Sequence, residues 1–237
     1  MLDQNNAVPL YKQLKEAVLG LILSGQLGAG DQLSTEQELS AQYGVSRITV
    51  RNAVTELVNE GYLQKRQGKG TFVCLPKIKR KAVHLLSFTA TCEASGMSAH
   101  SVVSKKQVLD DYPAARRVLD LGPDDRVLYI QRIRFADGSP LMLENNYYSF
   151  KRFAFLLNEP LEGSLYKLLS EGHNIRPTCS GETQLEVQRA SSEIARQMQC
   201  APGDPLFLMR TSVLDEFKQP IHYGEQLIIA DRYAFIF

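Results

Sequence analysis

The chain has 237 residues, of which 44% are hydrophobic and 22% are charged. This length is sufficient for two domains that each bury a core of their own. No run of about 18 apolar residues occurs, so we expect no membrane-spanning segment. The polar N-terminus has no basic region and predicts no signal peptide. The four cysteines lie far apart without a Cys-x-x-Cys pair, which indicates reduced thiols in a cytoplasmic protein and no zinc site: Cys74, Cys92, Cys179 and Cys200.

The net charge of +1 is unevenly distributed along the chain. Residues 1–81 contain 11 Lys and Arg against 7 Asp and Glu, a net charge of +4. The remaining residues contain 16 basic and 19 acidic side chains, a net charge of −3. A basic N-terminal part followed by a mildly acidic part is typical of a domain that binds a polyanion joined to a different kind of domain.

Three helices are predicted in the N-terminal part. Pro9 begins a run of apolar residues at helical spacing that ends at Gly25. Thr35 and Glu38 form the pattern of a capping box, which predicts a second, short helix that ends at Gly44. Ser46 is the expected cap of a third helix, which ends at Gly61. Two short helices joined by a turn that contains glycine are the helix-turn-helix arrangement, whose second helix usually enters the major groove of DNA.

The third predicted helix carries two arginines on the face opposite its apolar residues. Arg47 and Arg51 are one helical turn apart, a spacing that suits one contact to a base edge and another to a base or phosphate. A solvated basic helix face is the alternative interpretation. The segment from Tyr62 to Val73 then predicts a β-hairpin with a glycine-rich tip and the basic residues Lys65, Arg66 and Lys69. A basic hairpin directly after a recognition helix is typical of a DNA-binding wing, although a hairpin alone could be an ordinary surface feature.

These motifs together resemble the DNA-binding domain of the GntR family. The resemblance rests on Pro9-Leu10-Tyr11, Gly30-Asp31, Leu33-Ser34-Thr35-Glu36, Ser46-Arg47-Ile48-Thr49-Val50-Arg51 and Gly68-Lys69-Gly70-Thr71-Phe72-Val73. It implies operator contacts at Arg47, Thr49, Arg51 and Gly68, beside Lys69. Gln37 stands where the family often has an arginine that binds DNA. The candidate DNA-binding residues are therefore Thr35, Gln37, Ser46, Arg47, Thr49, Arg51, Asn52, Lys65, Gly68 and Lys69.

The domain organisation follows from these patterns. We expect a winged helix-turn-helix domain over residues 1–75, a basic linker over residues 76–82 and a second domain over residues 83–237. The linker Pro76–Lys81 is interpreted as a solvated hinge, with contact to a phosphate backbone as the alternative.

The second domain is predicted to be α+β. Helices are expected at Ala114–Leu121, Ser164–Glu171 and Ala190–Gln199, and strands at His100–Leu109, Val127–Phe135, Pro140–Tyr148, Cys179–Val187, Pro205–Leu214 and Pro220–Ile229. A unit of helix, Pro/Gly turn, strand, polar turn and strand occurs twice. Two copies predict a pseudo-twofold antiparallel sheet with helices on one side and a ligand site between the halves.

Two arginines lie on a largely apolar face of one predicted strand. Arg132 and Arg134 share this face with Leu128 and Ile130. Buried arginines need anionic partners, and a bound phosphate or carboxylate would serve. The alternatives are ion pairing with Glu144 on the neighbouring strand, or a strand end that emerges into water.

The second domain resembles UTRA, the effector domain of the HutC-type GntR regulators, whose sheet is similar to that of chorismate lyase. The resemblance rests on Leu86-Ser87-Phe88-Thr89, Tyr129–Arg134, Asp137–Leu141, Glu144, Gly163–Tyr166 and Asp231–Tyr233. It implies that Ser87, Thr89, Arg132, Arg134, Ser164 and Tyr166 surround an anionic group, often a sugar phosphate, and that Glu144 meets its polar end. His222 and Ile228 stand where a glutamate and a tyrosine are common. The candidate effector-binding residues are Ser87, Phe88, Thr89, Arg132, Arg134, Glu144, Ser164, Tyr166, His222 and Tyr233.

The sequence thus predicts a winged helix-turn-helix followed by a chorismate-lyase-like antiparallel β-sheet domain. The expected function is that of a homodimeric regulator, a repressor, which binds palindromic double-stranded operator DNA and responds to a small anionic metabolite such as a sugar phosphate. No cofactor, no metal and no catalytic residue are expected, because no motif for them occurs. Three alternatives remain open: a chorismate-lyase-like enzyme domain fused to a DNA-binding module, an effector of another class such as an organic acid, and an architectural DNA-binding protein without an effector.

Overall fold

The computed structural model describes residues 2–3, 7–28, 30–74, 77–81 and 86–236. The chain separates into two compact units, Met1–Lys77 and Ile78–Phe237. Each unit has its own hydrophobic core, as the length predicts.

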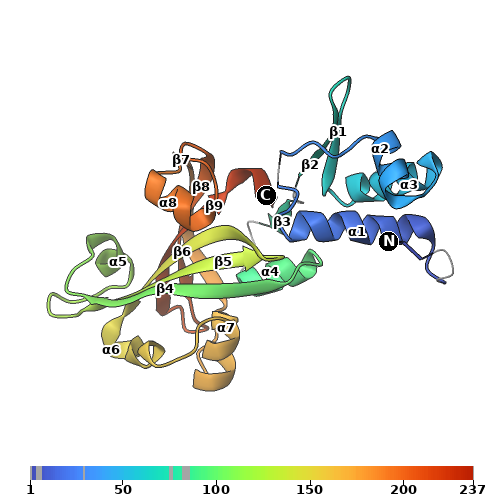
Figure 1. Cartoon of the computed structure of the whole chain (residues 1–237). Helices are drawn as coiled ribbons and strands as arrows, with labels where there is room; N and C mark the ends of the chain where they lie inside the picture. The colour runs from blue at the N-terminus through green and yellow to red at the C-terminus, as the bar shows by residue number, and fades with distance from the viewer. Residues whose placement is uncertain (1, 4–6, 29, 75–76, 82–85, 237) are drawn as a thin grey trace. The chain divides into compact units, whose positions relative to one another are not determined.

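The N-terminal unit contains the three expected helices, α1 (Leu10–Leu23), α2 (Glu36–Tyr43) and α3 (Arg47–Asn59) (Figure 1). Both predicted caps are present, because the side chain of Thr35 accepts from the Glu38 N–H and that of Ser46 accepts from the Thr49 N–H. Gly44 has the left-handed conformation, with φ of 66°, that ends α2 and allows the turn into α3. The core lies between the helices and the hairpin and is formed by Leu14, Val18, Val50, Leu57, Leu63 and their neighbours.

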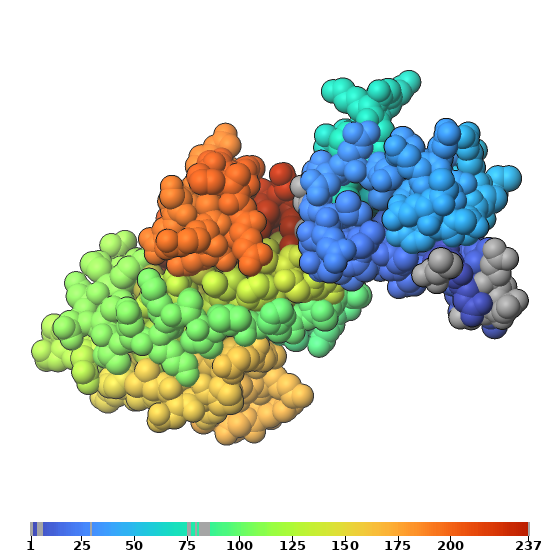
Figure 2. Space-filling view, in the orientation of Figure 1, coloured from blue at the N-terminus to red at the C-terminus, as the bar shows by residue number. Residues whose placement is uncertain are grey.

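The predicted wing is an antiparallel hairpin of β1 (Leu63–Arg66) and β2 (Gly70–Val73). Its turn is closed by the Lys69 N–H, which donates to the Arg66 carbonyl at 3.0 Å, and Gly68 there has a φ of 70°, a conformation that favours glycine. The side chain of Gln32 fastens the hairpin to the body by donating to the Lys69 carbonyl at 3.0 Å. The tip of the wing protrudes from the surface of the N-terminal unit (Figure 2).

The C-terminal unit is built on a six-stranded antiparallel sheet, as predicted. The strand order is β4-β5-β6-β9-β8-β7, so the first three strands and the last three are related by the expected pseudo-twofold symmetry (Figure 1). Their bounds are β4 (Ala99–Leu109), β5 (Val127–Ala136), β6 (Ser139–Ser149), β7 (Cys179–Arg189), β8 (Pro205–Leu214) and β9 (Pro220–Ile229).

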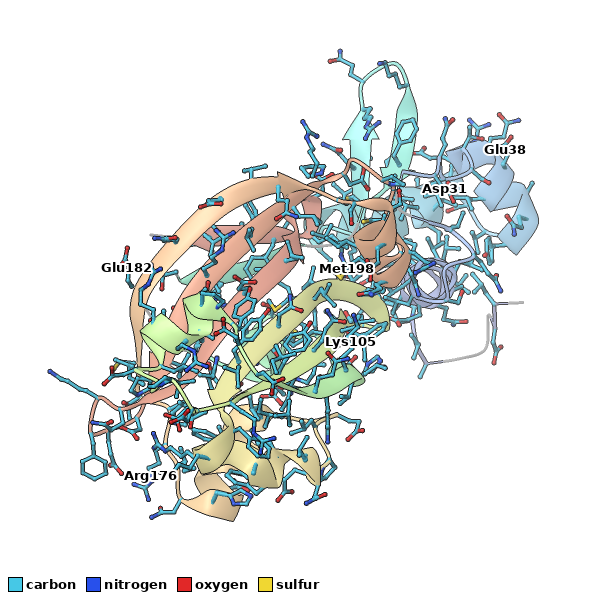
Figure 3. The ribbon with its side chains drawn as sticks, turned by 90° about the vertical axis from the view of Figure 1, so that its left-hand side faces the viewer. Asp31, Glu38, Lys105, Arg176, Glu182 and Met198 are labelled. Carbon is cyan, nitrogen blue, oxygen red and sulfur yellow. The ribbon has the colours of Figure 1, made fainter. Side chains whose placement is uncertain are left out.

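Helices cover both faces of this sheet, so the expectation of helices on one side is wrong. α4 (Phe88–Ala94), α6 (Phe150–Phe153) and α7 (Leu165–Lys167) pack on one face, and α5 (Pro113–Val118) and α8 (Ser192–Met198) pack on the other. Met198 of α8, for example, lies against this second face (Figure 3). The reason lies in the central strand β6, whose successive residues from Pro140 to Tyr148 are all buried, which requires cover on both faces.

A pair of short parallel strands was not predicted. β3 (Ile78–Lys81) pairs with β10 (Tyr233–Ile236), and Ile78 is fully buried in the core of the C-terminal unit. The interpretation of this segment as a solvated hinge is therefore wrong for residues 78–81. The sequence shows no clear strand pattern here, because Ile78 is the one apolar residue among three basic residues. The strand that pairs with this segment, β10, lies more than 150 residues further along the chain. Residues 76 and 82 of the expected linker lie outside the described residues.

The burial of Ile78 gives a direct test of this correction. We expect Ile78→Ala to lower the free energy of unfolding of the C-terminal unit by about 2–5 kcal/mol, because it removes a fully buried aliphatic side chain. The exposed neighbour provides the control, since Lys77→Ala is expected to change stability by less than about 0.5 kcal/mol. Denaturant titration of the full chain checks both values, and equal effects would contradict the assignment of β3 to the core.

Candidate DNA-binding surface and effector pocket

The helix α3 presents one buried and one exposed face, as a recognition helix requires. Val50, Ala53, Val54 and Leu57 face the core. Arg47, Arg51 and Asn52 are exposed. The basic residues of this helix are therefore available to a ligand outside the protein.

Arg51 is held by an ion pair with Glu36 at the start of α2. Its Nε and Nη2 donate to the two carboxylate oxygens at 3.2 Å and 2.8 Å. The pKa of Glu36 is lowered, chiefly by this hydrogen bond and further by the charges of Lys65 and Arg47. Basic residues of α3 and of the wing thus act on the same carboxylate, that of Glu36. The side chains of the pair are 61% and 34% exposed, so a DNA phosphate or base can replace the carboxylate at little cost.

Two other predicted residues, Ser46 and Thr35, serve first as helix caps. The Ser46 hydroxyl accepts from the Thr49 N–H at 3.1 Å and lies 2.9 Å from the Thr49 hydroxyl. Thr35 forms the capping box with Glu38, whose carboxylate accepts from the Thr35 hydroxyl at 2.9 Å. Gln37 is exposed in the first turn of α2. The structure therefore gives Ser46 and Thr35 a role in fixing the two helices, whether or not they contact DNA.

The wing carries its predicted residues on an exposed surface. Lys65, Gly68 and Lys69 are exposed along the hairpin. Arg66, which the list of candidate residues omitted, lies over the ring of Phe72 at 4.6 Å from its centroid. This stacking holds the guanidinium group against the hairpin and places a further positive charge on the wing.

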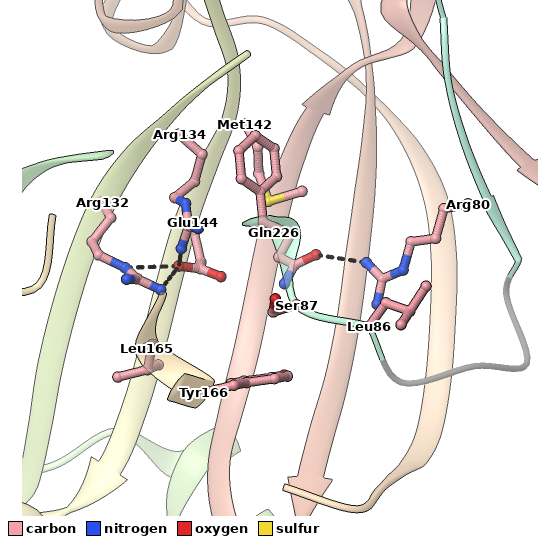
Figure 4. Close-up of a pocket in the computed structure, with 11 residues that line it drawn as sticks. Arg80, Leu86, Ser87, Arg132, Arg134, Met142, Glu144, Leu165, Tyr166 and Gln226 are labelled. Carbon is pink, nitrogen blue, oxygen red and sulfur yellow. Dashed lines mark hydrogen bonds and ion pairs between the residues drawn. The ribbon is translucent and has the colours of Figure 1, made fainter. Parts of the chain in front are cut away.

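A small pocket lies on the face of the sheet covered by α4 and α7 (Figure 4). Its cavity volume is about 20 Å³, and the space becomes about 350 Å³ when the open solvent at its entrance is included. Its lining comes from β3, β5, β6, β9, α7 and the segment that enters α4, and comprises Arg80, Leu86, Ser87, Phe88, Arg132, Arg134, Met142, Glu144, Leu165, Tyr166 and Gln226.

The centre of this pocket is a carboxylate shared by two arginines. Nε of Arg132 donates to Oε2 of Glu144 at 2.9 Å, and its Nη2 donates to the same oxygen. Nη1 of Arg134 donates to that oxygen at 3.2 Å. Arg132 and Arg134 are each 2% exposed and Glu144 is 7% exposed, so the three charges are almost fully removed from water. The alternative of ion pairing with Glu144 is thus realised, but with one carboxylate for two guanidinium groups.

Glu144 and Arg134 are both charged at neutral pH. Burial alone would raise the pKa of Glu144, but the charges of Arg132 and Arg134 outweigh it and lower that pKa to about 2. Burial, together with the charge of Arg132, lowers the pKa of Arg134 to about 10, still well above neutrality. The cluster therefore carries a surplus of one positive charge in a poorly solvated place, which favours binding of an anion.

Neutral groups orient the two guanidinium groups. Nη1 of Arg132 donates to the carbonyl of Leu161 at 3.1 Å. The guanidinium of Arg134 lies 4.7 Å from the ring centroid of Phe88, and its Nη2 donates to the Thr89 hydroxyl at 3.4 Å. Within the described residues, Nε of Arg134 is buried without a hydrogen-bond partner. The donors are thus fixed in position, and not all of them are satisfied by the protein.

Six of the predicted effector-binding residues line the pocket: Ser87, Phe88, Arg132, Arg134, Glu144 and Tyr166. Thr89 contacts Arg134 and Ser164 caps α7, next to the lining. Tyr233 is buried in the core beside β3. His222 is buried near the rings of Tyr148 and Tyr166, with centroids 5.5 Å and 6.2 Å away. The structure therefore brings six of the ten residues to the pocket surface and places the other four beside or behind it.

The sequence prediction missed other lining residues, of which Arg80 and Gln226 are polar. Gln226 is opposite Glu144 in the register of β9 and β6, a relation that only the sheet pairing reveals. Arg80 lies in β3, within the segment that was expected to be a linker. Ile78 and Arg80 are two residues apart, as side chains on one face of a strand are, and this spacing is the one pattern in the segment that could have indicated a strand.

Comparisons with known proteins find a matching family for each of the two units. The sequence matches the family described as bacterial regulatory proteins, gntR family, over residues 10–73, and the UTRA domain over residues 94–234. It is 33% identical over 237 residues to the HTH-type transcriptional regulator YurK of Bacillus subtilis (strain 168), covering 99% of this chain and 97% of the relative. It is 30% identical to the probable fructoselysine utilization operon transcriptional repressor of Escherichia coli (strain K12), covering 94% and 91%. The crystal structure of PhnF from Mycobacterium smegmatis superposes with a TM-score of 0.69 at 27% identity, covering 93% of this chain and 96% of that one.

The molecule is a DNA-binding transcription regulator rather than an enzyme. The chain belongs to the GntR family of bacterial regulators and carries a UTRA effector domain. Among the described residues, no helix is long and apolar enough to cross a membrane.

The pair of Arg51 and Glu36 leads to a prediction for DNA binding. We expect Arg51→Ala to weaken binding to an operator duplex by about tenfold or more, because it removes an exposed guanidinium group from the recognition helix. Operators selected from a random duplex library with the wild-type protein supply the probe for a gel-shift titration. The control is Arg196→Ala, the same change at an exposed position of α8. Equal loss in both variants would contradict the assignment.

The buried histidine leads to a prediction for stability. Burial lowers the pKa of His222 from 6.5 to about 4, so below pH 6.5 the unfolded chain binds a proton that the folded chain does not. Stability is therefore lost as the pH falls from 6.5 to 4. We expect His222→Gln to reduce the dependence of the melting temperature on pH in this window, whereas His100→Gln, at an exposed position, leaves it unchanged. Identical pH profiles for wild type and His222→Gln would show this prediction to be wrong.

Proposed function

We propose that this protein is a homodimeric cytoplasmic repressor that binds palindromic operator DNA and is released when a phosphorylated sugar occupies the pocket of the UTRA domain. The winged unit would read the operator through Arg47 and Arg51 of α3 and through the wing residues. The C-terminal unit would sense the metabolite. An organic acid is the alternative effector.

The observation that carries the proposal is the buried pair of arginines that share one carboxylate. Arg132 and Arg134 cost much free energy to bury, and Glu144 neutralises only one of them. A phosphate group offers several oxygens to the remaining donors and suits the planar fork of a guanidinium group. The surplus charge also argues against a purely architectural role, in which protein carboxylates would balance the arginines.

Polar groups around the cluster support a sugar as the rest of the effector. The carboxylate of Glu144, the amide of Gln226 and the hydroxyl of Ser87 line the same pocket and can bind hydroxyl groups. The name of the relative from Escherichia coli, a repressor of a fructoselysine utilization operon, fits an effector of this class.

The dimer is proposed from symmetry and from one sheet edge. Recognition of a palindrome requires two copies related by a twofold axis. β7 lies at the edge of the large sheet and exposes Leu185 and Val187, which are 37% and 69% exposed. A strand edge with exposed apolar side chains suits pairing with a second copy. In this proposal the effector favours a dimer geometry that fits the operator less well, so it must bind that geometry more tightly.

A gel-shift titration tests the proposed function. The full chain is bound to its selected operator, and hexose phosphates, pentose phosphates and matching sugar acids are added one at a time. We expect at least one sugar phosphate to lower operator affinity, and the sugar acids to have no effect at the same concentration. If no phosphorylated metabolite changes operator affinity, the proposal is wrong.

The role of the arginine cluster is tested by a variant. We expect Arg132→Ala to leave operator affinity within about twofold of wild type and to abolish the response to the effector, because the binding donors are lost while the DNA-binding unit is intact. Since removal of one member of a buried ion pair destabilises the fold, Arg132→Lys is measured in parallel and is expected to show a weakened response. Arg117→Ala, on the exposed surface of α5, is the control. An unaltered response of Arg132→Ala would refute the anion site.

A further inference from the structure

A third arginine reaches the effector pocket from an unexpected element. Arg80 lies on β3, on the same side of that strand as the buried Ile78, because successive side chains of a strand alternate. It faces Gln226 across the pocket, and its Nη1 donates to Oε1 of that residue at 3.5 Å (Figure 4). This hydrogen bond is at the outer limit of distance and so is weak.

Arg80 differs from the other two arginines in its charge partners. Arg132 and Arg134 both form ion pairs with Glu144. In the part of the chain that the structure describes, no carboxylate lies within 4.0 Å of the Arg80 guanidinium. Of the three, Arg80 therefore has the most to gain from a bound anion.

The charge of the pocket sets the charge of the ligand. Three arginines and one glutamate line it, which gives a net charge of +2. A phosphate monoester carries a charge of about −1.5 to −2 at pH 7 and balances this surplus, whereas a carboxylate balances only half of it. Without Arg80 the pocket would carry +1 and a carboxylate would suffice. Arg80 thus favours a doubly charged effector.

A contact between Arg80 and a bound anion would also involve the start of the C-terminal unit, because Arg80 lies on β3. β2 of the wing ends at Val73, and β3, the first element of the C-terminal unit, begins at Ile78. An anion that binds both Arg80 and the Arg132–Arg134 pair connects the start of the C-terminal unit to the large sheet. β3 is otherwise held by its pairing with β10 and by the packing of Ile78 in the core.

We propose that Arg80 is the effector-contacting residue that couples occupancy of the pocket to the segment leading into the DNA-binding unit. This inference rests on the proposed function, since it assumes that the pocket binds a phosphate group. The bound phosphate holds β3, the first element of the C-terminal unit, against the large sheet and so stabilises the strand that follows the DNA-binding unit in the chain. In this proposal Arg80 binds the anion and also transmits its binding to β3.

The first experiment measures anion binding with inorganic phosphate as the probe. Calorimetric titration of the full chain is carried out for wild type, Arg80→Gln, Arg80→Lys and Arg117→Gln. We expect Arg80→Gln to weaken phosphate binding by about tenfold, Arg80→Lys to weaken it less because the charge is kept, and Arg117→Gln to bind as wild type does. Arg117 is matched as an exposed arginine on the opposite face of the sheet. Circular dichroism confirms that each variant is folded.

The second experiment separates coupling from mere binding. Hydrogen exchange of the amides in Ile78–Lys81 is compared with and without phosphate, at concentrations that give equal occupancy in each protein. We expect phosphate to slow exchange in wild type by about tenfold or more and to have little effect in Arg80→Gln. Wild-type affinity or wild-type protection in Arg80→Gln would overturn the inference and leave the proposed function standing. Absence of phosphate binding by the wild-type protein would overturn both.

Discussion

The structure depends on one interaction above all, the shared carboxylate of Glu144. A single oxygen of this side chain accepts hydrogen bonds from Arg132 and Arg134, and all three groups are buried in the C-terminal unit. Two guanidinium cations and one carboxylate together have a net charge of +1. The protein therefore holds an excess positive charge where water gives little stabilisation. Such an arrangement is unfavourable unless a ligand completes it. This surplus charge is the basis for the proposal that the pocket binds an anion.

The rest of the C-terminal unit positions this cluster. The antiparallel register places Arg132 opposite Glu144 and Glu144 opposite Gln226, so that three neighbouring strands bring their polar residues to one place on an otherwise apolar face. The helices on both faces exclude water from the sheet. They also keep the guanidinium groups in fixed orientations, since α4 supplies the ring of Phe88 and the hydroxyl of Thr89. A site on rigid strands can distinguish ligands by charge and shape.

The sequence predicted the parts of this molecule whose signals are local. The helix caps at Thr35 and Ser46, the glycine turns and the alternation of the long strands all depend on neighbouring residues, and the structure confirms them. The strand pairing of β3 with β10 depends on residues far apart in the chain, and no local pattern indicates it. For the same reason Arg80 and Gln226 were missed from the pocket, while His222, which was expected in it, is buried with its ring centroid 6.2 Å from that of Tyr166 and does not line the pocket. The arginine pair could be predicted because charged residues on an apolar strand face are conspicuous.

The two units perform separate tasks with different electrostatics. In the N-terminal unit the basic residues are exposed and Arg51 forms an ion pair that solvent screens, so polyanion binding there is expected to depend strongly on salt. In the pocket the arginines are buried, and salt screens them much less. Binding of the proposed effector is therefore expected to depend less on salt than binding of DNA does.

The selection of a doubly charged anion by the three arginines of the pocket, Arg80, Arg132 and Arg134, is the central claim, and calorimetry tests it most directly. Hexose 6-phosphates and the hexonic acids of the same carbon skeleton are titrated into the full chain at one ionic strength. The account predicts that at least one phosphate binds and that every hexonate binds at least about tenfold more weakly, because a single carboxylate leaves positive charge unbalanced in the pocket. A hexonate that binds as tightly as the best phosphate would contradict it.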